Sequence, residues 1–155
     1  MTRTAAVLAL LLLLLLLVAA PATAAAAAYR GKTKSGTSIT FTLSGPRISA
    51  VRTSVPATCI ETTGTNATRA GVELFQPPST FALGATGKTK ALQPAAMNRG
   101  VKATKNYTFS SKRGAGGKIT GTLRVSFSFL GLGADPYHSL IYVCTGSSTF
   151  TASPR

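Results

Sequence analysis

Residues 118–129 read Lys-Ile-Thr-Gly-Thr-Leu-Arg-Val-Ser-Phe-Ser-Phe, and this stretch predicts the fold class. The apolar side chains share one parity: Ile119, Leu123, Val125, Phe127 and Phe129. Hydroxyl and cationic side chains occupy the other parity. Alternation with a period of two places the apolar set on one face of a β-strand, because successive side chains point to opposite faces. Gly121 interrupts that face and predicts a bulge or close packing.

Shorter stretches repeat the alternation. They are residues 39–43, 48–55, 72–74, 107–109 and 150–152, with a phase slip near Ala50-Val51. The continuous apolar run 140–144 predicts a strand that is covered on both faces. Glu73 lies between Val72 and Leu74, so this pattern predicts that its side chain points to solvent.

Turn sequences separate these strands. Ser44-Gly45-Pro46 joins the first two, residues 112–117 read as a hairpin loop, and 131–136 break the chain before the 140–144 strand. About seven short strands with polar turns predict an all-β fold, an antiparallel sandwich or barrel, and we expect the β-sandwich. Residues 76–99 hold three prolines and predict a long irregular segment, with at most one further strand near 81–83.

The N-terminus has the layout of a secretory signal peptide. Arg3 is followed by an apolar segment that includes the leucine run 11–17, and Ala22-Thr23-Ala24 fits the cleavage pattern. Alternative cleavage positions lie between Ala24 and Ala28. We expect a cleaved leader over residues 1–28 and one domain over 29–155. A retained anchor is the alternative, but the apolar stretch is shorter than the roughly 20 residues that a spanning helix needs, and no later segment is long enough.

The mature chain is strongly basic. The whole chain has 17 Lys and Arg against three acids. Loss of Arg3 with the leader leaves 16 cations against Glu61, Glu73 and Asp135, a formal charge of +13. Two cysteines remain, Cys59 and Cys144. An even count in an exported chain predicts one disulfide, and two free thiols or a metal pair are the alternatives.

Short motifs spread over the mature chain resemble those of small exported β-sandwich proteins of unknown function from high-GC Gram-positive bacteria. The motifs are Tyr29-Arg30-Gly31-Lys32-Thr33, 39–43, Cys59, Gly121-Thr122-Leu123, Cys144-Thr145-Gly146 and Phe150-Thr151-Ala152. The long 76–99 stretch departs from that pattern. The resemblance implies a bacterial sandwich with one disulfide, and it implies no activity.

Catalytic and cofactor motifs are scarce. Three acids offer little for a carboxylate pair of the kind that hydrolyses glycosides. His138 lies three residues after Asp135, so a hydrolase that uses a serine with these two residues is a formal alternative. We favour the simpler explanation that Asp135-Pro136 starts a turn and that His138 is a loop residue. No phosphate-binding loop or dinucleotide fingerprint occurs, and metal ligands are too few for a metal site. We therefore predict no cofactor, no metal and no identified catalytic residue.

Charge is the most informative functional feature. Half of the mature cations lie between residues 88 and 118, and no acid occurs between Glu73 and Asp135. The predicted anion-binding residues are Lys88, Lys90, Arg99, Lys102, Lys105, Lys112, Arg113 and Lys118. Such a stretch predicts a non-enzymatic exported protein that binds anionic polysaccharide, wall polymer or extracellular nucleic acid. Solubilising a Thr-rich sheet is the simpler explanation of these cations. A structural or protein-interaction module is a third possibility, and it predicts an exposed apolar patch.

Overall fold

A computed structural model describes residues 25–98, 101–132 and 139–155. The described residues form an all-β fold with nine antiparallel strands and two 3-10 turns. The strands are β1 Ala27–Thr33, β2 Ser38–Ser44, β3 Arg47–Glu61, β4 Thr68–Phe75, β5 Phe81–Ala82, β6 Thr86–Pro94, β7 Lys102–Arg113, β8 Ile119–Leu132 and β9 Ser139–Pro154. The 3-10 turns are η1 Ala96–Asn98 and η2 Ala115–Gly117.

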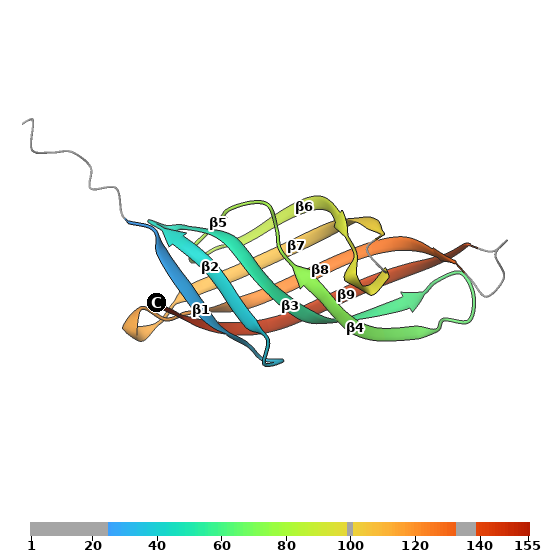
Figure 1. The fold of residues 1–155 in the computed structure, drawn as a ribbon, viewed down its shortest axis with the longest axis horizontal. Helices are drawn as coiled ribbons and strands as arrows, with labels where there is room; N and C mark the ends of the chain where they lie inside the picture. The colour runs from blue at the N-terminus through green and yellow to red at the C-terminus, as the bar shows by residue number, and fades with distance from the viewer. Residues whose placement is uncertain (1–24, 99–100, 133–138) are drawn as a thin grey trace, which may run out of the picture.

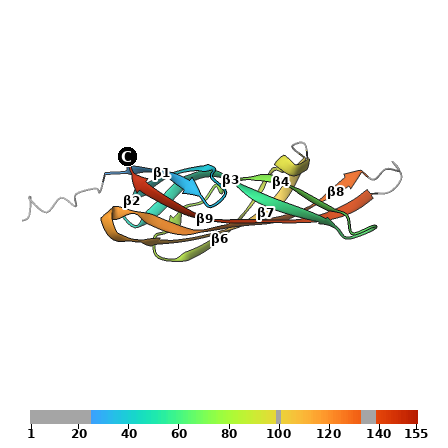
Figure 2. The same cartoon turned by 90° about the horizontal axis from the view of Figure 1, so that it is seen from below.

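The strands form one continuous sheet that folds over itself into two layers (Figure 1). Their order is β4-β3-β2-β1-β9-β8-β7-β6, and β5 pairs with β3. The edge-on view shows β1 above β6, with β9 running from the lower level up to β1 at its C-terminal end (Figure 2). β9 belongs to both layers, because its first half pairs with β3 and its second half pairs with β1. The β1–β2 hairpin therefore fills the space where β3 and β9 diverge.

The core lies between the two layers and is rich in aromatic rings. Phe109 of β7 stacks on Phe81 and Phe150, with ring centroids 5.0 and 5.5 Å apart. Phe150 meets Phe41 of β2 edge to face at 6.0 Å. These contacts join strands from both layers. The rings point inward, as the alternation along the strands predicts.

The prediction of one disulfide is confirmed. Cys59 of β3 and Cys144 of β9 are direct partners in the ladder, with Cα atoms 4.0 Å apart, and they are bonded to each other. Both cysteines are buried. Met97 of η1 lies against this bond, with its sulfur 3.7 Å from that of Cys59. The covalent link therefore closes the sheet at the point where the two layers share a ladder.

Nine strands replace the predicted seven for two reasons. The two apolar segments at 140–144 and 150–152 belong to one long strand, β9, and β1, β5 and β6 are additional. β6 lies in the stretch predicted to be irregular. Its inward residues are only half-buried and small or polar, such as Gly87 and Thr89, so this edge strand leaves no apolar alternation in the sequence.

Three local predictions have clear outcomes. The phase slip near Ala50-Val51 is a β-bulge, where the β2–β3 register shifts and Ala50 takes a φ of 52°. The predicted hairpin at 112–117 is confirmed, since Arg113 pairs with Ile119 across η2. The expectation that 140–144 is covered on both faces is wrong, because Ile141 and Val143 are exposed on the outer side of a single layer.

The leader lies largely outside the described residues, which begin at residue 25. Ala27 and Ala28, which the predicted leader includes, form the start of β1. Ala28 pairs with Thr42, and its carbonyl oxygen accepts a hydrogen bond from the Arg155 backbone N–H at 3.0 Å. The described residues contain no helix that is long and apolar enough to cross a membrane.

Candidate functional site

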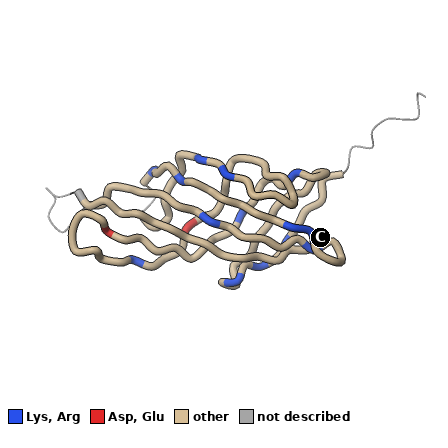
Figure 3. Tube along the Cα trace, turned by 180° about the vertical axis from the view of Figure 1, so that it is seen from behind, with Lys and Arg blue, Asp and Glu red and all other residues tan. Residues whose placement is uncertain are grey.

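The described surface carries cations without exposed acidic side chains. Glu61 and Glu73 are 4% and 0% exposed. Glu61 accepts a hydrogen bond from the Thr65 backbone N–H at 2.9 Å. The exposed cations of the described residues are Arg30, Lys32, Lys34, Arg47, Arg52, Arg69, Lys88, Lys90, Lys102, Lys112, Arg113, Lys118, Arg124 and Arg155. Figure 3 shows these basic positions spread over several strands. A surface of one sign attracts anionic partners over long distances.

Four of the eight predicted anion-binding residues lie on the outer face of β6 and β7. Lys88 and Lys90 of β6 have the exposed parity of that strand, as do Lys102 and Lys112 on β7. Arg113 and Lys118 are exposed at the hairpin end of the same layer. Arg99 lies outside the described residues. The predicted stretch therefore brings cations to one layer, although other cations occupy β3 and β4 on the opposite layer.

Lys105 is the exception, and the structure corrects its assignment. Its side chain is 1% exposed and points between the layers, because it has the inward parity of β7. The Lys105 Nζ atom lies 2.6 Å from Glu73 Oε1 and also donates to the Pro94 carbonyl oxygen at 2.5 Å. A buried and paired ammonium does not contribute to a surface that binds polymers.

Glu73 corrects the prediction that its side chain faces solvent. Val72 and Leu74 are 54% and 49% exposed, so β4 has the opposite parity from the one expected. The Glu73 carboxylate accepts backbone N–H groups from Ala96 and Met97 at 3.2 and 3.3 Å. A buried carboxylate requires such partners. The Glu73 carboxylate of β4 therefore binds both the backbone of η1 and Lys105 of β7. These two strands lie near opposite ends of the strand order.

Tyr107 lies beside this ion pair on β7. Its hydroxyl donates to Gln93 Oε1 at 2.6 Å. Burial raises the pKa of Tyr107 well above its usual range, and the negative charge of Glu73 adds to the increase. Tyr107 is consequently a neutral hydrogen-bond donor in the folded protein.

The strand register places cations in two parallel rows on the outer face. One row runs Lys112–Thr120–Thr151–Lys32 across β7, β8, β9 and β1. The other runs Lys88–Thr108–Arg124–Ser147 across β6, β7, β8 and β9. The rows are four residues apart along β7, about 13 Å at the usual rise of a strand. Lys32 and Arg124 are not among the predicted residues, because only the register shows that they share these rows.

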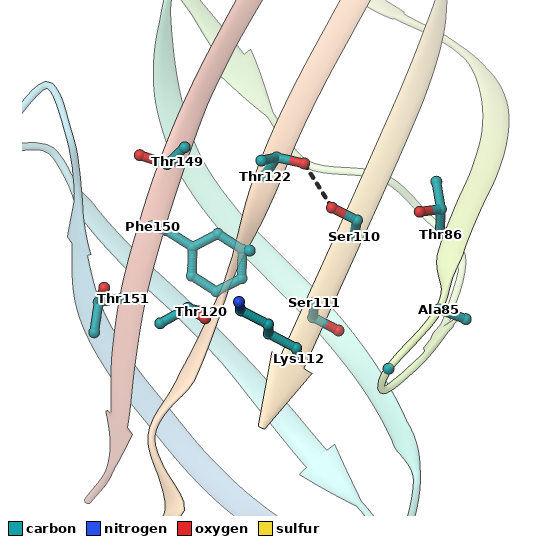
Figure 4. Close-up of a pocket in the computed structure, with 12 residues that line it drawn as sticks. Ala85, Thr86, Ser110, Ser111, Lys112, Thr120, Thr122, Thr149, Phe150 and Thr151 are labelled. Atoms are coloured by element: carbon teal, nitrogen blue, oxygen red, sulfur yellow. Dashed lines mark hydrogen bonds between the residues drawn. The ribbon is translucent and has the colours of Figure 1, made fainter. Parts of the chain in front are cut away.

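A hydroxyl-rich depression lies between the rows, and Figure 4 shows its lining. Its volume is about 480 Å³. Six hydroxyl side chains line it together with Lys112: Thr86, Ser110, Thr120, Thr122, Thr149 and Thr151. Ser111, Gly121 and Phe150 alternate with them along the strands and have the inward parity. We call this feature the hydroxyl basin. It takes its side chains from β6, β7, β8 and β9, four strands that follow one another in the chain.

Gly121 has the inward parity of β8, and its position is tightly packed. A Cβ atom at this position would overlap the Ser110 carbonyl oxygen and would lie 2.7 Å from Cε1 of Phe150. The Phe150 ring therefore occupies the space where a side chain would stand, which confirms the close packing predicted at Gly121. Ser111, the ladder partner of Gly121, has a buried hydroxyl with no hydrogen-bond partner among the described residues.

The far end of the same outer face is apolar. Leu130 and Ile141 are ladder partners on β8 and β9, and Val143 pairs with Ile60 of β3. Leu92 and Leu130 are both 65% exposed, and they line one depression with Ile141 and Lys102. We call Ile60, Leu92, Leu130, Ile141 and Val143 the aliphatic patch. An exposed group of this kind is typical of a contact surface.

The residues of the predicted hydrolase, Asp135 and His138, lie outside the described residues. Within the described ranges, no three potential metal-ligating side chains come together. The chain matches no protein-family model, no curated protein and no solved structure. The resemblance to exported bacterial sandwich proteins therefore stays a prediction.

Proposed function

We propose that this protein is an exported, non-enzymatic β-sandwich that binds anionic polymers outside the cytoplasm through the outer face of β1 and β6 to β9. One observation carries the proposal: the described surface exposes many cations, whereas both described acidic side chains are buried. The sequence features of a signal peptide support export. The Cys59–Cys144 bond also supports it, because disulfides persist mainly in oxidising compartments.

Salt dependence tests the electrostatic part of the proposal. We expect the protein to bind immobilised heparin at low ionic strength, with an affinity that falls steeply as salt is added, because ions screen exposed charges. Failure to bind heparin at low ionic strength, or binding that is insensitive to salt, would contradict it.

Matched charge reversals test which face binds. Lys88→Glu with Arg124→Glu changes the row on β6 and β8, whereas Arg47→Glu with Arg52→Glu changes the net charge equally on β3. Lys88 and Arg124 flank Thr108 about 10 Å apart, two strand spacings. We expect the first double variant to lose much more heparin affinity than the second. Equal losses would show that net charge alone matters and would refute the assignment of a binding face.

The aliphatic patch favours a second candidate function, a structural module that pairs with a second copy of itself. A symmetric pair would bury the same patch on both copies. Sedimentation velocity should then show a dimer that Leu130→Ser with Ile141→Ser converts to monomer. A monomeric protein at high concentration would eliminate this candidate.

A further inference from the structure

We propose that the hydroxyl basin is a subsite for one sugar unit of an acidic polysaccharide, with Lys112 pairing with its carboxylate or sulfate group. This inference rests on the proposed function, and it narrows the anionic polymer to a carbohydrate.

The lining of the basin suits a ligand that both donates and accepts hydrogen bonds. Each serine or threonine hydroxyl has one donor and two acceptor sites, whereas Lys112 only donates. Thr86, Ser110, Thr122 and Thr149 stand in one row across β6, β7, β8 and β9. Sugar rings carry hydroxyl groups that match such a row. A chain of phosphates offers mainly acceptors, so it would leave most of this capacity unused.

The basin offers no exposed aromatic ring, which argues against nucleic acid as the occupant. Phe150 is 3% exposed, and its ring packs against Phe41 and Phe109 in the core between the layers. Proteins that bind single-stranded nucleic acid rely on exposed aromatic faces on which bases stack.

Charge at the basin is sparse. Lys112 belongs to its lining, and Lys32 stands at the other end of the same row, beyond Thr120 and Thr151. Three strand spacings separate them, about 14 Å. Widely spaced cations with hydroxyls between them match a polymer whose charges are separated by neutral ring atoms.

The test compares two ligands and two matched variants by isothermal titration calorimetry. The ligands are a short oligogalacturonate and inorganic polyphosphate of similar charge. Thr120→Val with Thr122→Val removes two hydroxyls from the basin, whereas Thr104→Val with Thr145→Val removes two exposed hydroxyls of the same layer outside it. All four positions are in strands, where valine is well tolerated.

We expect the basin variant to lose about tenfold in affinity for oligogalacturonate, from the loss of two hydrogen bonds. Its binding of polyphosphate should be unchanged, because the variant keeps all of its cations. The control variant should bind both ligands like the natural protein. Equal oligogalacturonate affinities for the two variants would overturn the inference.

Lys112→Gln provides a second measurement. We expect the natural protein to prefer oligogalacturonate over its methyl ester, and this preference to shrink in the variant. An unchanged preference would exclude Lys112 as the partner of the anionic group. If polyphosphate binds at low salt but oligogalacturonate does not, this inference fails while the proposed function stands. If neither binds, the proposed function itself fails.

Discussion

The Lys105 ammonium of β7 lies 2.6 Å from the Glu73 carboxylate of β4, and both side chains are fully enclosed between the layers. The same carboxylate holds the backbone of η1. A hydrogen-bonded ion pair in this position joins segments from opposite ends of the sheet order. Because the pair buries Glu73, one of the few acids, the charge of the described surface is almost entirely positive.

Breaking this pair should destabilise the fold strongly. Lys105→Met leaves the Glu73 charge buried without its partner, and such losses typically cost about 3–5 kcal/mol. Urea denaturation at neutral pH measures the change in the free energy of unfolding. Adding Glu73→Gln removes the unpaired charge and keeps an amide oxygen that can accept from the backbone of η1. The double variant should therefore recover part of the lost stability. A Lys105→Met protein as stable as the natural one would contradict the structural role of the pair.

Stability should fall in alkaline solution partly through Tyr107. Its pKa in the folded protein is raised, so above about pH 10 the unfolded chain releases the phenolic proton while the folded protein retains it. The folded state then binds more protons, and its stability decreases as pH rises. Urea denaturation at a series of alkaline pH values measures this decrease. The stability of Tyr107→Phe should depend less steeply on alkaline pH. An identical pH dependence in the two proteins would show that Tyr107 does not cause the decrease.

The disulfide should contribute substantially to stability. The bond closes a loop of 85 residues, for which the chain-entropy model gives about 4–5 kcal/mol. The Cys59→Ala, Cys144→Ala double variant removes the bond without leaving a free thiol. Its unfolding midpoint in urea should lie well below that of the oxidised protein and close to that of the reduced protein. Equal midpoints for the oxidised and reduced forms would refute the expectation.

Gly121 should tolerate no side chain. A Cβ atom would overlap a backbone oxygen, which cannot move as a flexible side chain can. We expect Gly121→Ala to cost about 1–3 kcal/mol or more. Gly114→Ala is the matched control in the adjoining hairpin, because the nearest neighbour of an added Cβ atom there would be the Lys118 oxygen at 3.8 Å and its φ of −109° suits any residue. Thermal unfolding should separate the two variants clearly, and equal midpoints would contradict the tight packing at Gly121.

Processing of the leader should leave Ala27 and Ala28 in place. Both residues pair with β2, and Ala28 holds the backbone of Arg155. Cleavage after Ala24, at the end of the Ala22-Thr23-Ala24 pattern, would preserve this part of β1. We expect intact-mass analysis of the secreted protein to place its first residue at Ala25. A first residue at Tyr29 would show that the mature protein lacks these contacts.

The sequence alone determined the all-β class, the disulfide partners and several turns. Period-two alternation at Ile119–Phe129 depends only on the geometry of a single strand, and two cysteines allow one intramolecular pair. The same local reasoning read Glu73 incorrectly, because Val72 and Leu74 look like an inward pair although β4 turns them to solvent.

Only the tertiary structure decided which cations lie in one row. Parity on β7 turned Lys105 inward to Glu73, and the register of four strands set Lys112 in one row with Lys32, 80 residues away in the chain. The hydroxyl basin has the same origin, since its residues are common and unremarkable in each strand. Long-range pairing is chosen by packing of the whole core, and alternation within one strand carries no information about its neighbours.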